Sequence, residues 1–341
     1  MKTFKHYPKR LFTCLALFLV VTGCAKGEMR PVTIEDDSTG AGSQPSLIDD
    51  TTNHQGSIDD PSSTPSTDPV TGPGGIEVEE EREFDLSEIT GNPQELERFT
   101  FGEVDLSWED EIPNTAALEI INLHGHISIR PSMHASKITV EARKSSASSP
   151  SSSVNVVIIR HTEGVVICSI YPDVSGQEPN TCAMNGQSNL HRSNSDVSVD
   201  YEISIPNNML VYAYSRDGDI EIDNVRRGVD AHAVNGSIYI TSEEVAMANT
   251  MNGDIDVSFN PAFASTYDLS SFGFMTQNGE LTIKVPSDSS LSFYGHTTVG
   301  RVWTDFDFYA EGSSTVDGVL NGGEVEIYGM SQNGDVNLRR Q

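Results

Sequence analysis

The sequence is poor in basic residues. Its 341 residues include 21 Lys and Arg against 50 Asp and Glu, which gives a formal net charge of −29. A nucleic-acid partner needs a basic surface that neutralises phosphates, so this balance excludes that class of partner. The hydrophobic fraction is also low, at 36%, which indicates that much of the chain lies outside any packed core.

The sequence also lacks an apolar run long enough to remain in a membrane as a helix, which takes roughly 20 residues. Residues 11–21 form a shorter apolar run, preceded by a basic start and followed by small residues. That order predicts a secretory signal peptide over residues 1–23. The basic residues of the start are Lys2, Lys5, Lys9 and Arg10.

The end of this segment, Val21-Thr22-Gly23-Cys24, resembles the bacterial lipobox. The resemblance implies that the signal peptide is cut before Cys24 and that Cys24 carries diacylglycerol and a further acyl chain such as palmitate. Several acyl chains together anchor a protein stably to a membrane. Ala25 in place of Asp implies sorting to the outer membrane, on its surface or its periplasmic face. An ordinary signal peptide with an incidental cysteine is the alternative.

Residues 24–95 lack any apolar periodicity and are rich in Ser, Thr, Pro, Gly and acidic residues. Between residues 24 and 113 there are 23 acidic and 4 basic residues. Such a segment buries too little apolar surface to offset the entropy cost of ordering. We therefore expect a disordered acidic tether, with an end-to-end distance of roughly 45 Å as a flexible coil.

Helical periodicity is absent from residues 96–341, where apolar and polar residues alternate. A period of two indicates half-buried β-strands, so the predicted fold class is all-β. Residues 96–113 are expected to pack onto the edge of the domain that follows. Over residues 215–338 a unit recurs that consists of Gly, a variable residue, and then apolar, polar and apolar residues. Its copies start at Gly218, Gly236, Gly253, Gly279, Gly323 and Gly334, with an early copy at Gly125 and a degraded one at Gly300.

Asn precedes the glycine in four copies, at Asn235, Asn252, Asn278 and Asn333. Asn-Gly accepts positive φ readily, which predicts a tight turn at each of these positions. Two architectures use such a unit, a stack of β-hairpins or a β-solenoid in which each coil pairs with the next. The first two glycine intervals are 18 and 17 residues, which suits one small coil each. Small alternating residues such as Ala231, Ala233, Ala246 and Ala248 suit a thin core, so we favour the solenoid.

The recurrent Asn-Gly-Asp-Ile-x-Val pattern, seen at residues 252–257, resembles the "putative adhesin" or toastrack domain of bacterial envelope proteins. The resemblance covers about residues 114–338. It implies a right-handed, single-stranded β-helix with no enzymatic activity.

The sequence contains only four cysteines. Cys14 leaves with the signal peptide and Cys24 carries lipid, which leaves Cys168 and Cys182. An even pair in an exported domain predicts a disulfide. The alternative is a metal site built on two thiols, which lacks a second ligand pair nearby.

No nucleophile elbow, zinc-protease histidine pair or phosphate-binding glycine loop is present. His124 and His126 could begin a metal site, although a polar pair flanking Gly125 fits better. Asp219, Asp254 and Asp335 follow repeat glycines, but the nine-residue unit of calcium-binding β-rolls is absent. We therefore predict no catalytic residue, no metal and no cofactor.

Together these features predict a non-catalytic, lipid-anchored envelope protein whose solenoid binds an envelope or extracellular protein or glycan. Two alternatives remain open. One is a structural or envelope-stress sensory component that pairs with another envelope protein. The other, less favoured, is a polysaccharide-active solenoid enzyme.

Overall fold

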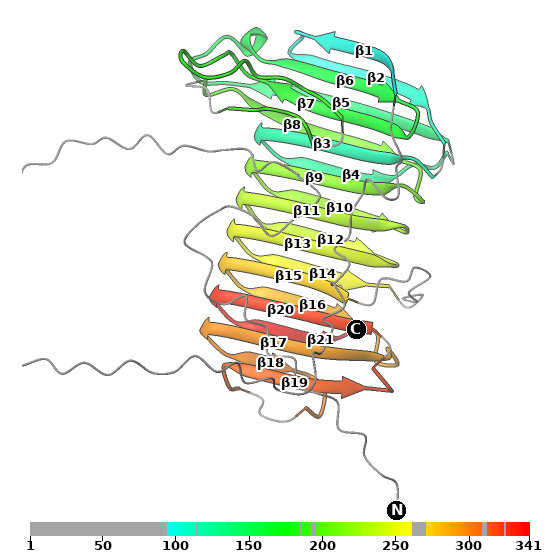
Figure 1. Cartoon of the computed structure of the whole chain (residues 1–341), viewed down its shortest axis with the longest axis vertical. Helices are drawn as coiled ribbons and strands as arrows, with labels where there is room; N and C mark the ends of the chain where they lie inside the picture. The colour runs from blue at the N-terminus through cyan, green and yellow to red at the C-terminus, as the bar shows by residue number, and fades with distance from the viewer. Residues whose placement is uncertain are drawn as a thin grey trace, which may run out of the picture. The chain divides into compact units, whose positions relative to one another are not determined.

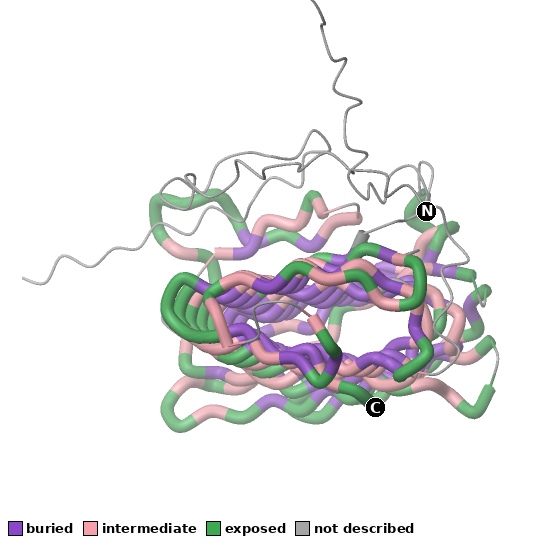
Figure 2. Tube along the Cα trace, turned by 90° about the horizontal axis from the view of Figure 1, so that it is seen from below, coloured by how far each residue is buried: buried purple, intermediate pink, exposed green. Residues whose placement is uncertain are grey.

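Two large β-sheets face each other across a hydrophobic core in the computed structural model (Figures 1 and 2). It describes residues 94–341 except 114, 135, 185, 192–194, 261–270, 309–311 and 324. Among the described residues, no helix is long and apolar enough to cross a membrane. The predicted signal peptide, Cys24 and nearly all of the predicted tether lie outside the described residues.

The first sheet, called sheet A, has 11 strands. In spatial order they are β1 (Glu95–Phe101), β6 (Asn155–His161), β7 (Gly164–Ile170), β3 (Ala117–His124), β9 (Leu210–Asp217), β11 (Gly228–Asn235), β13 (Val245–Asn252), β15 (Ser271–Asn278), β20 (Val325–Asn333), β17 (Leu291–Val299) and β19 (Thr315–Leu320).

The second sheet, called sheet B, has 10 strands. In spatial order they are β18 (Val302–Thr304), β21 (Val336–Arg340), β16 (Leu281–Val285), β14 (Ile255–Phe259), β12 (Ile238–Ser242), β10 (Ile220–Val225), β4 (Ile127–Pro131), β8 (Ser198–Ile205), β5 (Lys137–Ser145) and β2 (Asp105–Glu111).

From β9 to β17 the chain alternates between the two sheets, so that each coil contributes one strand to sheet A and one to sheet B. Neighbouring strands in this region are parallel, as in β11 against β13 and β12 against β14. The Asn-Gly turns therefore join strands of different sheets and not the two strands of a hairpin. The solenoid prediction is confirmed, and the hairpin alternative is wrong for these turns.

The core forms because alternate residues of each strand point between the sheets (Figure 2). Ile220, Ile238 and Ile255 are fully or almost fully buried on sheet B. They face small residues of sheet A such as Ala231 and Ala246, both completely buried. Small side chains let the two sheets approach closely, and removing this apolar surface from water supplies the main stabilising term.

The start of the described chain closes one end of the stack. β1 pairs antiparallel with β6, and β2 pairs antiparallel with β5. Leu106 is buried, and the rings of Phe99 and Trp108 lie 5.9 Å apart against the core. The predicted packing of residues 96–113 onto the domain edge is confirmed, with the first strand beginning at Glu95.

The opposite end departs from sequence order. β20 lies between β15 and β17 in sheet A, and β21 lies between β16 and β18 in sheet B. Residues 325–340 thus form a coil, called here the inserted coil, between two coils that precede it in the sequence. In Figure 1 the red strand β20 lies above the orange strand β17. The repeat copies therefore do not stack in sequence order at this position.

Candidate functional site

One edge of the solenoid carries a row of asparagine side chains, at the corners where sheet A strands end. Asn252 Nδ2 donates to Asn235 Oδ1, Asn278 Nδ2 donates to Asn252 Oδ1, and Asn333 Nδ2 donates to Asn278 Oδ1, each at 2.8 Å. The structure therefore brings the four predicted asparagines together as an amide ladder between coils. Their role is to link neighbouring coils as well as to shape the turns.

The glycines of these corners are required because the backbones of successive coils nearly touch. A Cβ atom on Gly253 would lie 2.1 Å from the carbonyl oxygen of Gly236, and one on Gly279 would lie 1.9 Å from that of Gly253. Gly253 and Gly334 have positive φ, of 157° and 150°, whereas Gly236 is not among the positive-φ residues. The prediction of positive φ thus holds at only some Asn-Gly corners, and close stacking is the more general reason for glycine.

The same short distances hold at the first corners of the stack. A Cβ atom on Gly125 would lie 2.3 Å from the Val199 carbonyl oxygen, and one on Gly218 would lie 2.1 Å from that of Gly125. Gly125, Gly218, Gly236, Gly253, Gly279 and Gly334 therefore share one structural role.

A second row of hydrogen bonds lies inside the corner. Thr250 Oγ1 donates to the Gly236 carbonyl oxygen at 2.8 Å, and Thr276 Oγ1 donates to that of Gly253 at 2.8 Å. Both threonines are buried. A buried carbonyl needs a donor, so these hydroxyls satisfy backbone groups that lie at the turn between two sheets.

The acidic residues that follow the glycines also bind the backbone. Asp219 Oδ1 accepts the Ser237 N–H at 2.8 Å, Asp254 Oδ1 accepts the Glu280 N–H at 2.7 Å, and Asp335 Oδ1 accepts the Arg301 N–H at 2.8 Å. A carboxylate accepts such bonds strongly because it is charged. These aspartates act as caps between coils, which explains their position without a calcium ion.

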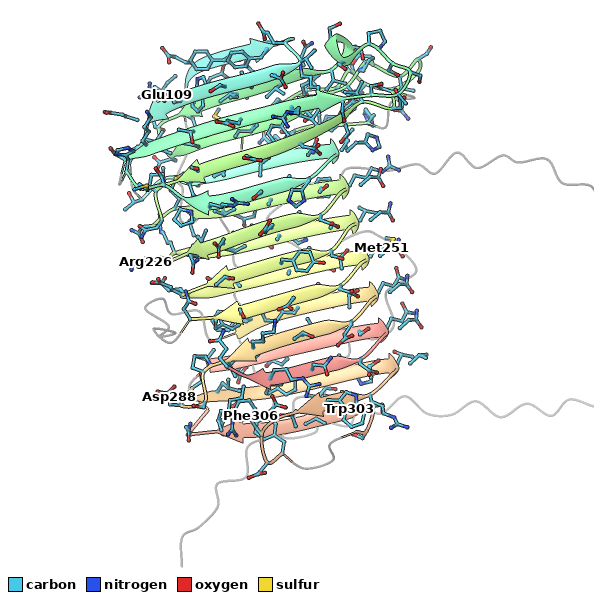
Figure 3. The ribbon with its side chains drawn as sticks, turned by 180° about the vertical axis from the view of Figure 1, so that it is seen from behind. Glu109, Arg226, Met251, Asp288, Trp303 and Phe306 are labelled. Carbon is cyan, nitrogen blue, oxygen red and sulfur yellow. A yellow bond between two sulfur atoms is a disulfide. The ribbon has the colours of Figure 1, made fainter. Side chains whose placement is uncertain are left out.

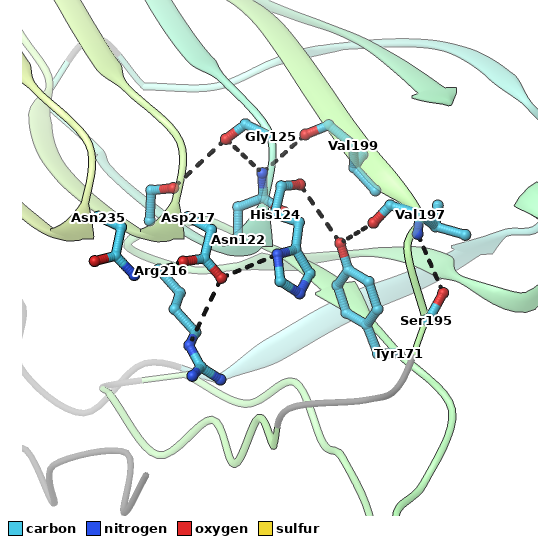
Figure 4. Close-up of polar contacts among 11 residues, drawn as sticks. Asn122, His124, Gly125, Tyr171, Ser195, Val197, Val199, Arg216, Asp217 and Asn235 are labelled. Atoms are coloured by element: carbon cyan, nitrogen blue, oxygen red, sulfur yellow. Dashed lines mark hydrogen bonds and ion pairs between the residues drawn. The ribbon is translucent and has the colours of Figure 1, made fainter. Parts of the chain in front are cut away.

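At the first two coils, the row of asparagine side chains is replaced by charged and aromatic side chains (Figure 4). Asp217 Oδ1 accepts from Asn235 Nδ2 at 2.6 Å, while Asp217 Oδ2 lies 3.1 Å from His124 Nδ1. The Tyr171 and His124 rings form a T-shaped pair with their centroids 5.4 Å apart. Figure 4 shows Arg216 reaching the same carboxylate, with its Nε 3.8 Å from Asp217 Oδ2.

His126 faces a different acid, since its Nε2 lies 3.8 Å from Glu221 Oε2. The two histidines therefore contact separate carboxylates, as expected for a polar pair around Gly125. Within the described part of the chain, no group of three or more His, Cys, Asp or Glu side chains is arranged to hold a metal ion.

A disulfide-bonded loop follows β7 and lies against sheet A. Cys168 and Cys182 are joined, as predicted, with their Cα atoms 5.8 Å apart. Inside the loop, Asn180 Nδ2 donates to the Tyr171 carbonyl oxygen at 3.1 Å. The Gly186 N–H donates to Glu119 Oε1 at 3.2 Å. Burial of the Glu119 carboxyl raises its pKa to about 7.

Two repeat copies differ from their predicted roles. Gly323 does not form a corner, because it lies in the turn before β20, where a Cβ atom would meet Ser292 Oγ at 2.5 Å. Gly300, predicted as a degraded copy, is a full corner, since a Cβ atom there would lie 2.3 Å from the Gly334 carbonyl oxygen.

The outer faces of the two sheets carry different side chains, which the sequence did not reveal. Across β9, β11, β13, β15, β20 and β17, the strand register aligns an outward row on sheet A. It consists of Tyr214, His232, Asn249, Met275, Met330 and His296. All of these residues except the exposed Asn249 are half-buried.

A neighbouring outward position on sheet A places Tyr294 beside Tyr328, with ring centroids 6.4 Å apart. We call these two tyrosines and the aligned row the sheet A face. Its polar side chains include the His232–Asp230 pair, where His232 Nε2 lies 2.8 Å from Asp230 Oδ1 and this acid raises the pKa of His232.

Sheet B presents charged side chains outward instead. Its aligned outward positions include Glu202, Glu221 and Asp256, and the Lys284 ammonium lies 2.7 Å from Asp256 Oδ2. Arg339 extends the charged face on β21 and binds Asp305 at 3.1 Å. Figure 3 views the molecule from behind and shows Trp303 and Phe306 at the end of the stack.

No protein-family model matches the chain, and no curated protein matches its sequence. Two solved structures are similar to it. One is "a putative cell adhesion protein from Clostridium sporogenes ATCC 15579", 10% identical, with 70% of this chain and 100% of that chain covered and a TM-score of 0.35. The other is "a putative adhesin" from Bacteroides fragilis NCTC 9343, 10% identical, covering 70% and 97%, with a TM-score of 0.27. The fold of this chain is therefore assigned from its own strand pairing and not from these similarities.

Proposed function

We propose that this chain is a non-catalytic, adhesin-like protein of the cell envelope, and that the sheet A face is its contact surface. The observation that carries the proposal is the alignment of tyrosine, methionine and histidine side chains across successive coils of sheet A. The partner is an envelope or extracellular protein.

The composition of this face supports a protein partner. Protein interfaces are enriched in tyrosine and methionine and depleted in lysine and acidic residues. Tyrosine supplies a large apolar area with a polar tip, and methionine adapts its shape to the surface it meets. The outer face of sheet B instead includes the charged Glu202, Glu221 and Asp256, which are residue types that protein interfaces tend to exclude.

The N-terminal segment completes the proposal. Acyl chains on Cys24 would hold the protein in the outer membrane, and the acidic tether of residues 24–95 would carry the solenoid away from the lipid. The high net negative charge of this segment would favour an extended chain through self-repulsion.

Capture of the purified full chain by intact cells, with and without prior protease treatment of the cells, tests this function. Peptidoglycan and extracted polysaccharides serve as further capture surfaces. We expect binding to cells that protease treatment abolishes. Binding to polysaccharide alone would replace the protein partner with a glycan. Binding to none of these surfaces would show that the proposal is wrong.

Paired variants locate the surface. Tyr294→Ala combined with Met330→Ala truncates the sheet A face, whereas Tyr239→Ala removes a 46% exposed tyrosine from the outer face of sheet B. We expect at least a tenfold weaker capture for the first variant, of the order that truncating interface anchors produces, and no change for the second. Equal effects of both would exclude the sheet A face.

A further inference from the structure

The inserted coil is held by two coils to which it is not directly connected in sequence. On one side, the Gly279 N–H donates to the Asn333 carbonyl oxygen at 3.0 Å, and Asn333 Nδ2 reaches Asn278 Oδ1 at 2.8 Å. On the other side, the Gly334 N–H donates to the Val299 carbonyl oxygen at 2.9 Å. Both sheets repeat this pattern, because β21 pairs parallel with β16 and with β18.

The inserted coil therefore fills a slot between two walls that are formed by other parts of the chain. The walls are β15 and β16 on one side and β17 and β18 on the other. All of the ladder contacts named above join the inserted coil to a wall and none joins it to β19, the strand that precedes it. The same contacts would form with residues 325–340 of any chain that has this sequence.

The connection into the slot is short and glycine-containing. β19 ends at Leu320 and β20 starts at Val325. Between them, Asn321, Gly322 and Gly323 all have positive φ, of 49°, 114° and 73°. Such a turn can open into an extended segment, and a short connection of this kind favours exchange of the element that follows it.

We propose that two copies of this chain associate by exchanging inserted coils, each coil occupying the slot of the other copy. The exchanged dimer keeps every coil-to-coil contact of the single chain and changes only the connection between Leu320 and Val325. Mass action then favours it where the protein is concentrated. The proposal stands independently of the partner suggested for the sheet A face.

A pair of cysteines across the wall tests the exchange in the full chain. Asn278→Cys with Asn333→Cys joins β15 to β20 at two exposed ladder positions that are aligned in register. Within one chain this disulfide leaves a monomer on a non-reducing gel, whereas in an exchanged dimer it links two chains. The protein is incubated reduced at several concentrations and is then oxidised by dissolved oxygen.

The matched control is Asn235→Cys with Asn252→Cys, which joins β11 to β13 through the same ladder geometry between coils that are consecutive in sequence. We expect the covalent dimer-to-monomer ratio of the first variant to rise about tenfold for a tenfold increase in concentration, by mass action. The control should remain monomeric throughout. An equally monomeric first variant, or dimers in equal amount from both, would overturn the proposal.

A second measurement tests the exchange if the introduced cysteines do not form a disulfide. Two populations of the otherwise unmodified full chain, carrying different affinity tags, are mixed at high concentration and captured through one tag. Recovery of both tags supports exchange, and recovery of one tag alone contradicts it.

Discussion

The consecutive coils from β9 to β14 and the inserted coil formed by β20 and β21 use the same contacts with different connectivity. In the consecutive coils, each corner binds the coil before it in the chain, as Asn252 binds Asn235. In the inserted coil, Asn333 binds Asn278, 55 residues away. The comparison indicates that the contacts of a coil depend on the two coils that flank it in space. They do not depend on whether those coils are its neighbours in the sequence.

The largest expected effect comes from replacing a corner glycine with alanine, which tests whether the inserted coil is packed as tightly as the consecutive coils. Gly279→Ala places a Cβ atom 1.9 Å from a carbonyl oxygen, and Gly334→Ala places one 2.0 Å from another. Each should lower the free energy of unfolding by about 3 kcal/mol, because the neighbouring backbone must move. Chemical denaturation measures the loss.

The control is Gly273→Ala, where the added Cβ meets nothing within 4 Å. Its effect should stay within about 0.5 kcal/mol. A much smaller loss for Gly334→Ala than for Gly279→Ala would mean that the inserted coil is held more loosely than the consecutive ones.

The buried hydroxyls give the next largest effect. Thr276 Oγ1 donates to the Gly253 carbonyl oxygen, and Ser331 Oγ donates to that of Gly279 at 3.0 Å. Thr276→Val and Ser331→Ala should each cost about 1–2 kcal/mol, because a buried carbonyl loses its donor. Thr282→Val, on the outer face of sheet B, is the control and should be nearly neutral. Equal stability of all three variants in urea would contradict this role.

Substitutions in the asparagine ladder should change the stability of the consecutive coils and of the inserted coil by different, smaller amounts. Asn252 both donates and accepts within the ladder, whereas Asn333 donates to Asn278 and is aligned with Val299 on its other side. Asn252→Ala should therefore cost about 1 kcal/mol and Asn333→Ala about half of that, since both sites are exposed. Thermal unfolding of the two variants side by side measures the difference, and the reverse order would refute it.

The pH dependence of stability distinguishes the disulfide-bonded loop, which contacts the buried Glu119, from the asparagine ladder, whose amides do not titrate. The folded pKa of Glu119, about 7, lies above its ordinary value of 4.5. Folding therefore favours the protonated form, and this contribution to stability is complete below about pH 4.5 and is lost as the pH rises through 7. The free energy of unfolding should fall over this interval by more in the unmodified chain than in Glu119→Gln. Parallel slopes for the two proteins would contradict the assignment.

The sequence predicted the features that are local. The Asn-Gly corners follow from adjacent residues, and the Cys168–Cys182 pairing follows from the two cysteines that lie outside the predicted signal peptide and lipidation site. The order of the coils could not be predicted, because the corners at Gly279 and Gly334 carry similar residues and either can stack on several neighbours. The same degeneracy led to the misreading of Gly323, where the alternation belongs to the long strand β20.

The sheet A face was also beyond the reach of a sequence pattern. Met275 and Met330 are adjacent because β15 and β20 are aligned, although 55 positions separate them in the chain. The alternation of apolar and polar residues predicts which side chains point outward. It does not predict which side chains lie next to one another, because that depends on how the strands are aligned.

The position of the inserted coil has a consequence for biogenesis. Because a chain is synthesised amino end first, β17, β18 and β19 are made before the coil that separates them from β15 and β16. Until residues 325–340 arrive, the backbone edges of four strands face an open gap. A truncated product would keep that gap and its unpaired edges, which are features that chaperones and proteases bind. The stack therefore closes only after residues 325–340 have been synthesised.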